Sequence, residues 1–388
     1  MASTEKYTEK LAKYIIYAAG LALALAVCWY FRKVLIYILL AVVVSLLAKP
    51  VVKLLKKIRI KNHAAPAPLL AALSLVIVLG LILGVLVLIV PIVSGMLKDI
   101  SMTNVGDAAR SLVVPLGELN EFLRHTFSSL GPDFRIEVFV VQELQKLIDV
   151  STFSSVLGSA ASFLTSFGIG LVATIFISFF FIKDDDLFSN IVCALVPDKL
   201  EEKVRKAISD IGYLLSRYFT GVIIQITEVA MLNFLGIWLI AGLGFNAALG
   251  IGFMCGILNM IPYIGPFMGG ALGTVIGLVL KYTSATPIGL DVSFWTFAII
   301  LIAIFCVAQF VDNMICQPLI YSTSIKSTPL EIFLVLMIVS NIGGPFAMIV
   351  AVPTYTIFRV IAFRFFGHVK AIKRLIPDEK LISVDKED

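Results

Sequence analysis

Charged side chains are scarce in this 388-residue sequence. Only 15% of the residues are Asp, Glu, Lys or Arg, whereas 59% are hydrophobic; soluble domains average about 25% and about 45–50%. Apolar runs of about 20 residues recur along the chain, which is the length that a helix needs to cross a bilayer. The composition excludes an ordinary soluble domain. It predicts an all-α, polytopic membrane protein with about eight spans in a lipid bilayer.

The sequence also lacks the signatures of several other classes of protein. The five cysteines are scattered, mostly inside apolar runs, and predict buried free thiols rather than disulfides or a zinc site. None of the three histidines belongs to a His-Glu-x-x-His pair, and neither a Gly-x-x-x-x-Gly-Lys loop nor a Gly-x-Ser-x-Gly elbow is present. A net charge of +5 is modest. We therefore expect no enzymatic activity, no cofactor, no metal site and no nucleic-acid partner.

Residues 1–92 are predicted to hold three spans, at 11–31, 34–47 and 68–90, with Arg32 and Lys33 as a short polar break between the first two. A run of basic residues without an acidic one follows the second span: Lys49, Lys53, Lys56, Lys57, Arg59 and Lys61. Because cytoplasmic loops are rich in Lys and Arg, this loop is predicted to be cytoplasmic, so the first two spans form a hairpin and the amino terminus is cytoplasmic too. The same strip is suited to anionic lipid headgroups.

Residues 93–156 are predicted to form a small extracytoplasmic helical insertion, because hydropathy drops there and apolar residues near 139–148 follow helical spacing. Its apolar face is expected to pack on the membrane domain, and a role in gating is the alternative. Residues 157–218 are predicted to hold a fourth span, at 157–182, and a cytoplasmic amphipathic helix, at 197–217. The acidic run between them predicts a solvated cap rather than a cation site.

Residues 219–368 are predicted to form the transport core, and its central feature is a break in apolar sequence. The fifth span, at 219–241, precedes it. Pro262 and Pro266 flank Gly265, and proline disrupts a helix interior. Broken backbone survives in hydrocarbon only when it is buried in protein or lines a wet cavity. We therefore expect two tightly packed helices, spans six and seven, joined at this break.

Glycines at four-residue spacing lie on both sides of this break. Each set leaves one helix face without side chains, which allows backbones to approach closely in a membrane. The predicted helix-packing glycines are Gly252, Gly256, Gly269, Gly273 and Gly277.

The last part of the core is predicted to be an eighth span and a broken hairpin. The span covers 294–311, and the apolar stretch at 329–366 is longer than one crossing needs. Gly344 and Pro345 lie in an interruption of that stretch, as expected where it enters the membrane and returns. Basic residues near its end predict a cytoplasmic tail at 369–388.

Glu228 is the most conspicuous single side chain, because a carboxylate inside a span is costly and is by default a functional candidate. Gln225 lies three residues earlier on the same helix face. The alternative is a glutamate that is hydrogen-bonded between helices or wetted at the interface. Gln309, Asp312 and Asn313 also fall on one face at the end of the eighth span. The alternative to a functional role for them is capping of the helix end. The predicted pathway residues are Gln225, Glu228, Asn259, Pro262, Gly265, Pro266, Gln309, Asp312, Asn313, Gly344 and Pro345.

An ordered set of motifs resembles the autoinducer-2 exporter family of bacterial membrane proteins over roughly residues 10–366. The central one is Asn-Met-Ile-Pro-Tyr-Ile-Gly-Pro at 259–266. The others are Lys183-Asp184-Asp185, Val-Pro-Asp at 196–198, Gln309 with Asp312-Asn313 and Gln317-Pro318, Thr328-Pro329-Leu330, and Ala351-Val352-Pro353.

This resemblance implies about eight spans, an oligomeric assembly in the bacterial inner membrane, and export of small polar solutes such as a furanone signalling molecule. Some relatives are assigned sodium/proton exchange instead. The sequence departs from the family pattern at Ser340 and Ala347, where glycine is usual, and at Glu228, in a span that is normally uncharged. The departures leave the substrate open and affect the fold little.

Three functions remain as hypotheses. The first is an exporter of small polar molecules, with an autoinducer-2-like signal as the leading substrate. The second is a sodium/proton antiporter that uses Glu228 as its carrier carboxylate. The third is a membrane scaffold that binds a partner through the extracytoplasmic insertion and transports nothing.

Overall fold

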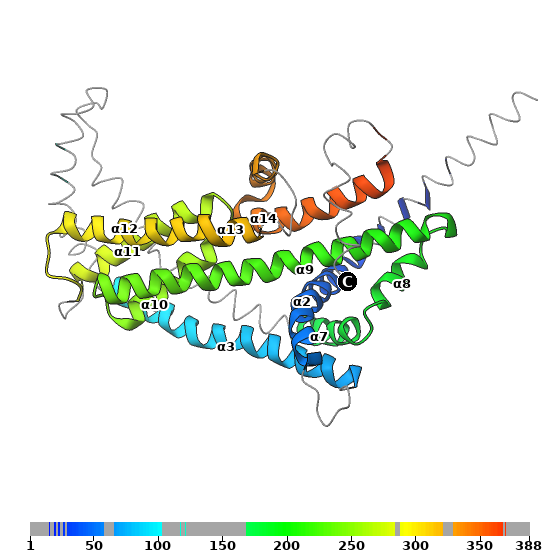
Figure 1. Ribbon diagram of the computed structural model, residues 1–388, viewed down its shortest axis with the longest axis horizontal. Helices are drawn as coiled ribbons and strands as arrows, with labels where there is room; N and C mark the ends of the chain where they lie inside the picture. The colour runs from blue at the N-terminus through cyan, green and yellow to red at the C-terminus, as the bar shows by residue number, and fades with distance from the viewer. Residues whose placement is uncertain are drawn as a thin grey trace, which may run out of the picture. The chain divides into compact units, whose positions relative to one another are not determined.

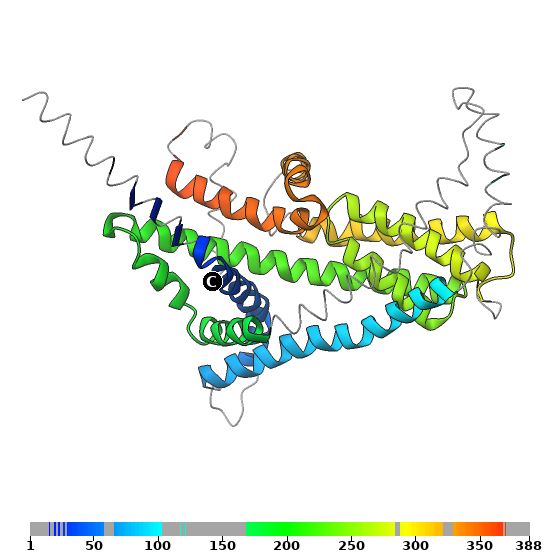
Figure 2. The same cartoon turned by 180° about the vertical axis from the view of Figure 1, so that it is seen from behind.

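The computed structural model describes residues 29–57, 66–102, 168–283, 288–320 and 329–367, together with isolated positions between 15 and 27 and at 117, 121 and 369. All regular structure in these residues is helical (Figures 1 and 2). Six of the described helices are long and apolar enough to cross a bilayer. The predicted fold class, a polytopic helical membrane protein, is confirmed. The chain divides into two compact units: Met1–Val78 with Ser162–Phe188, and Leu79–Ala161 with Ser189–Asp388.

The first unit is built on a close helix pair. Helix α2 (Arg32–Lys57) packs against α7 (Gly168–Lys183). The buried Ser178 hydroxyl donates to the carbonyl oxygen of Ala41 at 3.3 Å or to that of Thr174 at 2.7 Å. Small side chains at the contact let the backbones approach closely, which is how helices associate in a membrane.

The chain does not break at Arg32 and Lys33, so the predicted hairpin of the first two spans is wrong. The backbone N–H of Phe31 donates to Val27 O at 2.9 Å, and that of Leu35 donates to Phe31 O at 3.1 Å. These are helical hydrogen bonds on either side of the two basic residues. Two charges without proline or glycine do not end a helix. Most of the first predicted span lies outside the described residues.

Helix α3 (Ala67–Met102) is longer than the predicted third span. It continues through Pro91 into the stretch that was assigned to the extracytoplasmic insertion. Residues Ala67–Val85 of it are apolar enough to cross a bilayer. Apart from two isolated positions, the rest of that insertion lies outside the described residues, as do the first eleven residues of the predicted fourth span.

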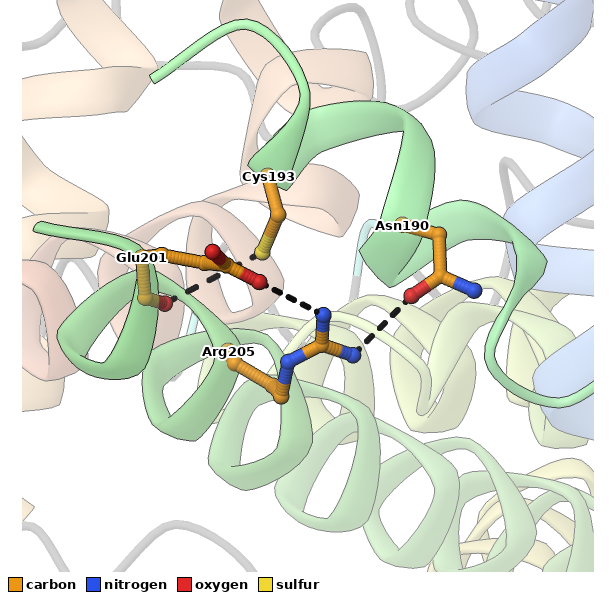
Figure 3. A network of polar contacts seen from close by, with 4 residues as sticks. All are labelled: Asn190, Cys193, Glu201 and Arg205. Carbon is orange, nitrogen blue, oxygen red and sulfur yellow. Dashed lines mark hydrogen bonds and ion pairs between the residues drawn. The ribbon is translucent and has the colours of Figure 1, made fainter. Parts of the chain in front are cut away.

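Polar contacts define the corner where α8 (Leu187–Cys193) meets α9 (Asp198–Leu235). Figure 3 shows the Arg205 guanidinium between the Asn190 amide oxygen and the Glu201 carboxylate, each 3.0 Å away. The Cys193 thiol points toward the backbone oxygen of Glu201 at 3.9 Å. Pro197 has extended backbone angles immediately before α9. Its fixed φ suits the start of a helix, so the Val-Pro-Asp turn and the helix after it lie where the sequence predicted them.

Helix α9 corrects the predicted division at residue 218. The amphipathic helix and the fifth span are one 38-residue helix, which continues into the π-helical turn η1 (Gly236–Ile240). No proline interrupts it, so nothing separates its polar first half from its apolar second half. The boundary that was predicted between a cytoplasmic helix and a transport core therefore falls inside a single helix.

Helices α10 (Phe245–Leu258), α11 (Ile264–Thr283) and α12 (Phe294–Val311) pack at the carboxyl end of α9 and around η1. Figures 1 and 2 show them gathered there. The fully buried side chains of their shared core include Ile237, Leu243, Ile251, Phe297 and Leu301. Helix α10 is about 20 Å long at 1.5 Å per residue, which is short of the roughly 30 Å of a bilayer core. Helix α10 is thus one of the shorter apolar helices and forms one arm of the predicted broken pair.

Helix α14 (Pro329–Phe366) is a hairpin, as the sequence predicted. Gly343 and Gly344 have non-helical backbone angles, and Gly344 has a φ of 63°, a conformation that favours glycine. The Tyr355 hydroxyl of the second arm donates to the Glu331 carboxylate of the first arm at 2.7 Å. A straight helix would separate these residues by about 36 Å. The first arm is the shorter one and is not among the helices long enough to cross a bilayer.

An ion pair joins α9 to the second arm of α14. Arg364 donates from Nε and Nη2 to Oδ2 of the buried Asp210, at 2.7 and 2.6 Å. Replacing Arg364 with glutamine is expected to lower the free energy of unfolding by about 2 kcal/mol. This is less than the roughly 3–5 kcal/mol for a fully buried pair, because the arginine is partly exposed.

Thermal unfolding in detergent measures this loss. The matched control is Lys206→Gln, which removes an exposed pair with Glu202 one helical turn away and should change stability little. Equal effects of the two substitutions would contradict the structural role of the Asp210–Arg364 pair.

Candidate functional site

The helical path breaks between α10 and α11, where the sequence predicted it. Asn259 caps the carboxyl end of α10, residues 260–263 form turns, and α11 begins at Ile264. Pro262 lies inside the turn and is buried. Pro266 lies in the first turn of α11, where its missing N–H costs no helical hydrogen bond. Both prolines therefore stabilise a break at this position.

Two residues in the break restrict its backbone. Tyr263 has a φ of 65°, which costs a non-glycine residue on the order of 1–3 kcal/mol. The ring of Tyr263 meets that of Phe333 on α14 edge to face, with centroids 6.1 Å apart. Gly265 is so close to the carbonyl oxygen of Leu258 that a Cβ atom would overlap with it. Contacts on both sides thus fix the shape of the turn.

Glycines on α10 bring this helix against the backbone of α9. A Cβ on Gly252 would lie 2.7 Å from the carbonyl oxygen of Ala230, and a Cβ on Gly256 would lie 2.6 Å from that of Ile226. Real Cβ atoms are not found so close to a backbone oxygen. The predicted packing role of both glycines agrees with this geometry. Because Gly256 is one turn before Asn259, the close approach carries Asn259 toward α9.

The glycines of α11 make a second close contact, with α12. A Cβ on Gly273 would lie 2.5 Å from the ring of Phe305, and one on Gly277 would lie 2.8 Å from Leu301. Gly269 has more room, with 3.4 Å to its nearest neighbour on α10. The two glycine rows together position α12 against the α10–α11 pair.

The end of α12 widens into a π-helical turn, η2 (Asp312–Cys316), followed by the short α13 (Gln317–Ile320). Single π-helical turns occur often at functional sites, because the wider turn changes which side chains share a face. Here it places Asp312, Asn313 and Gln317 on the same side as Gln309 of the preceding turn.

A buried carboxylate lies at the meeting point of these elements. The Asp312 side chain has no exposed surface. Its Oδ2 accepts hydrogen bonds from Gln225 of α9 at 3.0 Å, Asn259 at 3.1 Å, Gln309 at 3.2 Å and Gln317 at 3.1 Å. We refer to Asp312 and these four amide side chains as the Asp312 cluster. Residues from widely separated parts of the chain thus converge on one oxygen atom.

Asn313 extends the polar surface of the cluster. Its Oδ1 accepts from the amide nitrogens of Gln309 at 3.0 Å and Gln317 at 2.6 Å. Because amide groups have both donors and acceptors, these side chains can exchange partners with hydroxyl groups of a solute. Asn313 and Gln309 are more exposed than Asp312 and form the outer part of the cluster.

The charge of Asp312 has no cationic partner in the part of the chain that the structure describes. Its hydrogen-bond donors are neutral amides. Removing a carboxylate from water costs several kcal/mol, which hydrogen bonds offset only in part. Buried ionisable groups without an ion-pair partner are costly in a membrane and mark solute or ion pathways.

Five predicted pathway residues meet in or beside this cluster: Gln225, Asn259, Gln309, Asp312 and Asn313. Pro262, Gly265 and Pro266 form the adjoining break. Glu228 is partly buried on α9 and is not among the hydrogen-bond partners of Asp312. Gly344 lies at the kink of α14 and makes no hydrogen bond to the cluster. The side chain of Pro345 is outside the described part.

Sequence reasoning did not include Gln317 among the site residues and did not identify Asp312 as the centre. A signal was present, since Gln317 follows Asn313 by one helical turn and Asn313 follows Gln309 by another. The π-helical turn, which brings Asp312 onto the same face, has no comparable pattern in the sequence.

Six apolar helices long enough to cross a bilayer, among the described residues, and a buried polar cluster beside broken backbone define a polytopic membrane protein of the transporter class. A match to the AI-2E family transporter profile over residues 18–365 places the chain in that family. It is therefore a membrane transporter, embedded in a lipid bilayer and acting on a small solute.

Two curated relatives from Bacillus subtilis (strain 168) are similar to this chain. "Putative transport protein YueF" is 27% identical over 339 residues, which cover 86% of this chain and 84% of the relative. "Putative transport protein YrrI" is 26% identical over 196 residues, about half of each chain.

Proposed function

We propose that the protein exports small polar solutes from the bacterial cytoplasm across the inner membrane, with hydroxylated furanones of the autoinducer-2 type as the leading substrate. The observation that carries this proposal is the Asp312 cluster, in which four amides and one carboxylate converge inside an apolar helical core. Family membership supports transport.

The chemistry of the cluster suits a neutral, hydroxyl-rich molecule. A hydroxyl group can donate to the Asp312 carboxylate and accept from an amide N–H at the same time. Gln309 and Gln317 already bind two acceptors each, Asp312 and Asn313, so either can release one for a solute. A solute without hydroxyl groups would leave these buried polar atoms unsatisfied, which disfavours its binding.

Solute must reach a carboxylate that is fully buried, so transport requires the cluster to open. The α10–α11 break and the π-helical turn at Asp312 supply backbone without regular α-helical hydrogen bonds on two sides of it. Short helices and breaks of this kind surround the binding sites of many secondary transporters. We assign the movement to these segments and keep α9 as the fixed element.

The basic segments and the exposed apolar surfaces support a placement in the membrane and an assembly. The basic strip after α2 supports a cytoplasmic position for the loop that follows this helix, and the basic residues after α14 support a cytoplasmic carboxyl terminus. A homo-oligomer in the bilayer agrees with the exposed apolar side chains along α12, such as Ile299, Val307 and Phe310. The same surfaces suit lipid equally well.

Efflux from vesicles tests the proposal. Vesicles containing the purified protein and loaded with autoinducer-2 should release it faster than protein-free vesicles. Gln225→Leu should slow release about tenfold, the effect of losing about 1.4 kcal/mol of hydrogen bonding. Thr227→Val is the matched control. Thr227 lies on the same helix as Gln225, and its hydroxyl donates to the carbonyl oxygen of Ile223, one turn earlier in that helix. Equal release with and without protein for every hydroxylated solute tested would contradict the proposal.

Sodium/proton antiport is a second candidate, favoured by the same buried carboxylate. In that case the protein should move protons in response to a sodium gradient when no organic solute is present. The vesicle assay separates the two functions, since a pH indicator inside the vesicles reports antiport independently of solute release. Glu228→Gln tests whether the carboxylate predicted from the sequence takes part.

A further inference from the structure

Two oxygen atoms in the Asp312 cluster accept no hydrogen bond from any residue that the structure describes. They are Oδ1 of Asp312 and Oδ1 of Asn259, and both are buried away from solvent. The residues are 0% and 3% exposed. Buried polar atoms of this kind are rare and call for an explanation, since each costs about 1–3 kcal/mol when it has no partner.

The two residues are already joined through their other polar atoms. Nδ2 of Asn259 donates to Oδ2 of Asp312 at 3.1 Å. Their two remaining oxygens therefore belong to a carboxylate and an amide in direct contact. Both atoms are acceptors, so neither can satisfy the other unless a hydrogen atom is added.

We propose that this pair is a proton-binding site, in which a proton on Oδ1 of Asp312 is donated to Oδ1 of Asn259. The pair then forms two reciprocal hydrogen bonds, N–H to carboxyl oxygen and O–H to amide oxygen. One proton gives both orphaned oxygens a partner and removes the charge of a carboxylate that has no cationic partner among the described residues. On release, the proton leaves the O–H bond and its electron pair stays on the carboxylate.

The geometry favours a proton over a metal cation. All four amides present N–H groups to Oδ2 of Asp312, so this oxygen atom is not open to a metal ion. No group of three or more His, Cys, Asp or Glu side chains capable of holding a metal occurs in the described segments. A proton needs only the two oxygens that the pair leaves open.

Other ionisable side chains lie on the elements around the pair. Among the described residues, the hydrogen-bond donors to Asp312 are the four amides and not these ionisable groups. On α9, the α10–α11 pair and α14 they include Tyr218, Glu228, Cys255, Tyr263, Glu331, Tyr355 and Arg359. Cys255 donates to Gly269 O at 3.3 Å, and Glu331 pairs with Tyr355 and Arg359. Asp312 is thus the acid that a bound proton at this site would neutralise.

This inference deepens the proposed function, on which its consequence for transport depends. A proton and a solute hydroxyl compete for Asp312, because the charged carboxylate accepts from a hydroxyl and the protonated one instead donates to Asn259. Proton binding from outside would then expel the solute and reset the empty site. Transport of solute outward would be exchanged for protons inward.

Infrared difference spectroscopy between acidic and alkaline buffers tests proton binding on the full chain in vesicles. Beside the signal of exposed carboxyl groups, the wild-type spectrum should contain a carbonyl band from one buried protonated carboxyl group, and Asp312→Asn should lose this band. Glu228→Gln should keep it. Asn259→Leu should move the band to higher frequency, because the carboxyl carbonyl loses one hydrogen-bond donor. Potentiometric titration should find one proton fewer bound per chain in Asp312→Asn, independently of whether Asn259→Leu folds.

The inference is overturned if Asp312→Asn leaves both the band and the proton count unchanged. It is also overturned if the spectrum responds to sodium at constant pH but not to pH. These readouts require no transport, so they separate the two claims. If the protein releases solute but shows no Asp312 band, the export function is supported and the proton site is contradicted. If the band is present but no solute is released, the proton site is supported and the export function is contradicted.

Discussion

Replacing Gly256 with leucine is expected to destabilise the protein by about 3 kcal/mol or more and to abolish solute release. A Cβ at this position would lie 2.6 Å from the carbonyl oxygen of Ile226. A backbone atom cannot move aside as a flexible side chain can, so α10 would have to separate from α9. Overpacking a tight contact costs roughly 1–3 kcal/mol even where side chains can adjust.

The loss of function has a separate cause. Asn259 and Gln225 reach Asp312 from α10 and α9, and separating these helices pulls the two amides apart. Thermal unfolding in detergent and vesicle release measure the two effects. Gly84→Leu is the matched control, because Gly84 is a helical glycine whose added Cβ would meet no atom of another described segment within 4 Å. A Gly256→Leu protein as stable and active as this control would show that the close approach is not needed.

Replacing Asp312 with asparagine is expected to reduce solute release at least about 100-fold while the protein remains folded. The two side chains have the same shape, but asparagine carries no charge and presents N–H groups to amides that already donate to Oδ2. Losing a charge-assisted hydrogen bond costs about 1.5–3 kcal/mol, and about 2.7 kcal/mol corresponds to two decades in rate.

In Asp312→Asn the free energy of unfolding should fall only slightly, although the rate of solute release falls strongly. Neutralising a buried carboxylate that has no cationic partner among the described residues removes a desolvation cost, which offsets part of the lost hydrogen bonding. Asp291→Asn is the control, because Asp291 is exposed in the loop before α12. Unfolding of Asp312→Asn at a much lower temperature than this control would mean that the carboxylate is structural, and the role in transport would lose its support.

Much of the fold could be predicted, because the length of an apolar run and the positions of its prolines determine where a helix begins and ends without help from distant residues. The break at Pro262 and Pro266 and the hairpin at Gly344 follow from groups that cannot continue a helix. The glycine rows predicted close packing for the same reason, since a missing side chain is a local property. Helix ends without such residues could not be predicted, and the continuous α9 is the example.

The site could be predicted only in part, because convergence is a property of the tertiary structure. Polar residues in apolar spans marked Gln225, Asn259 and Asp312 individually. Glu228 drew attention as the isolated carboxylate in the middle of a span, whereas Asp312 resembled a helix-end residue until the π-helical turn and the α9–α10 contact placed it among four amides. The spacing of residues along α12 gives no information about the amides that α9, α10 and α13 contribute.

The account depends on Asp312 rather than Glu228 being the carboxylate that serves transport. The most direct measurement compares the initial rates of solute release from vesicles that contain Asp312→Asn or Glu228→Gln at equal protein density. We predict that Asp312→Asn loses at least about 100-fold in rate and that Glu228→Gln stays near the wild-type rate. Normal release by Asp312→Asn together with loss of release in Glu228→Gln would contradict the account.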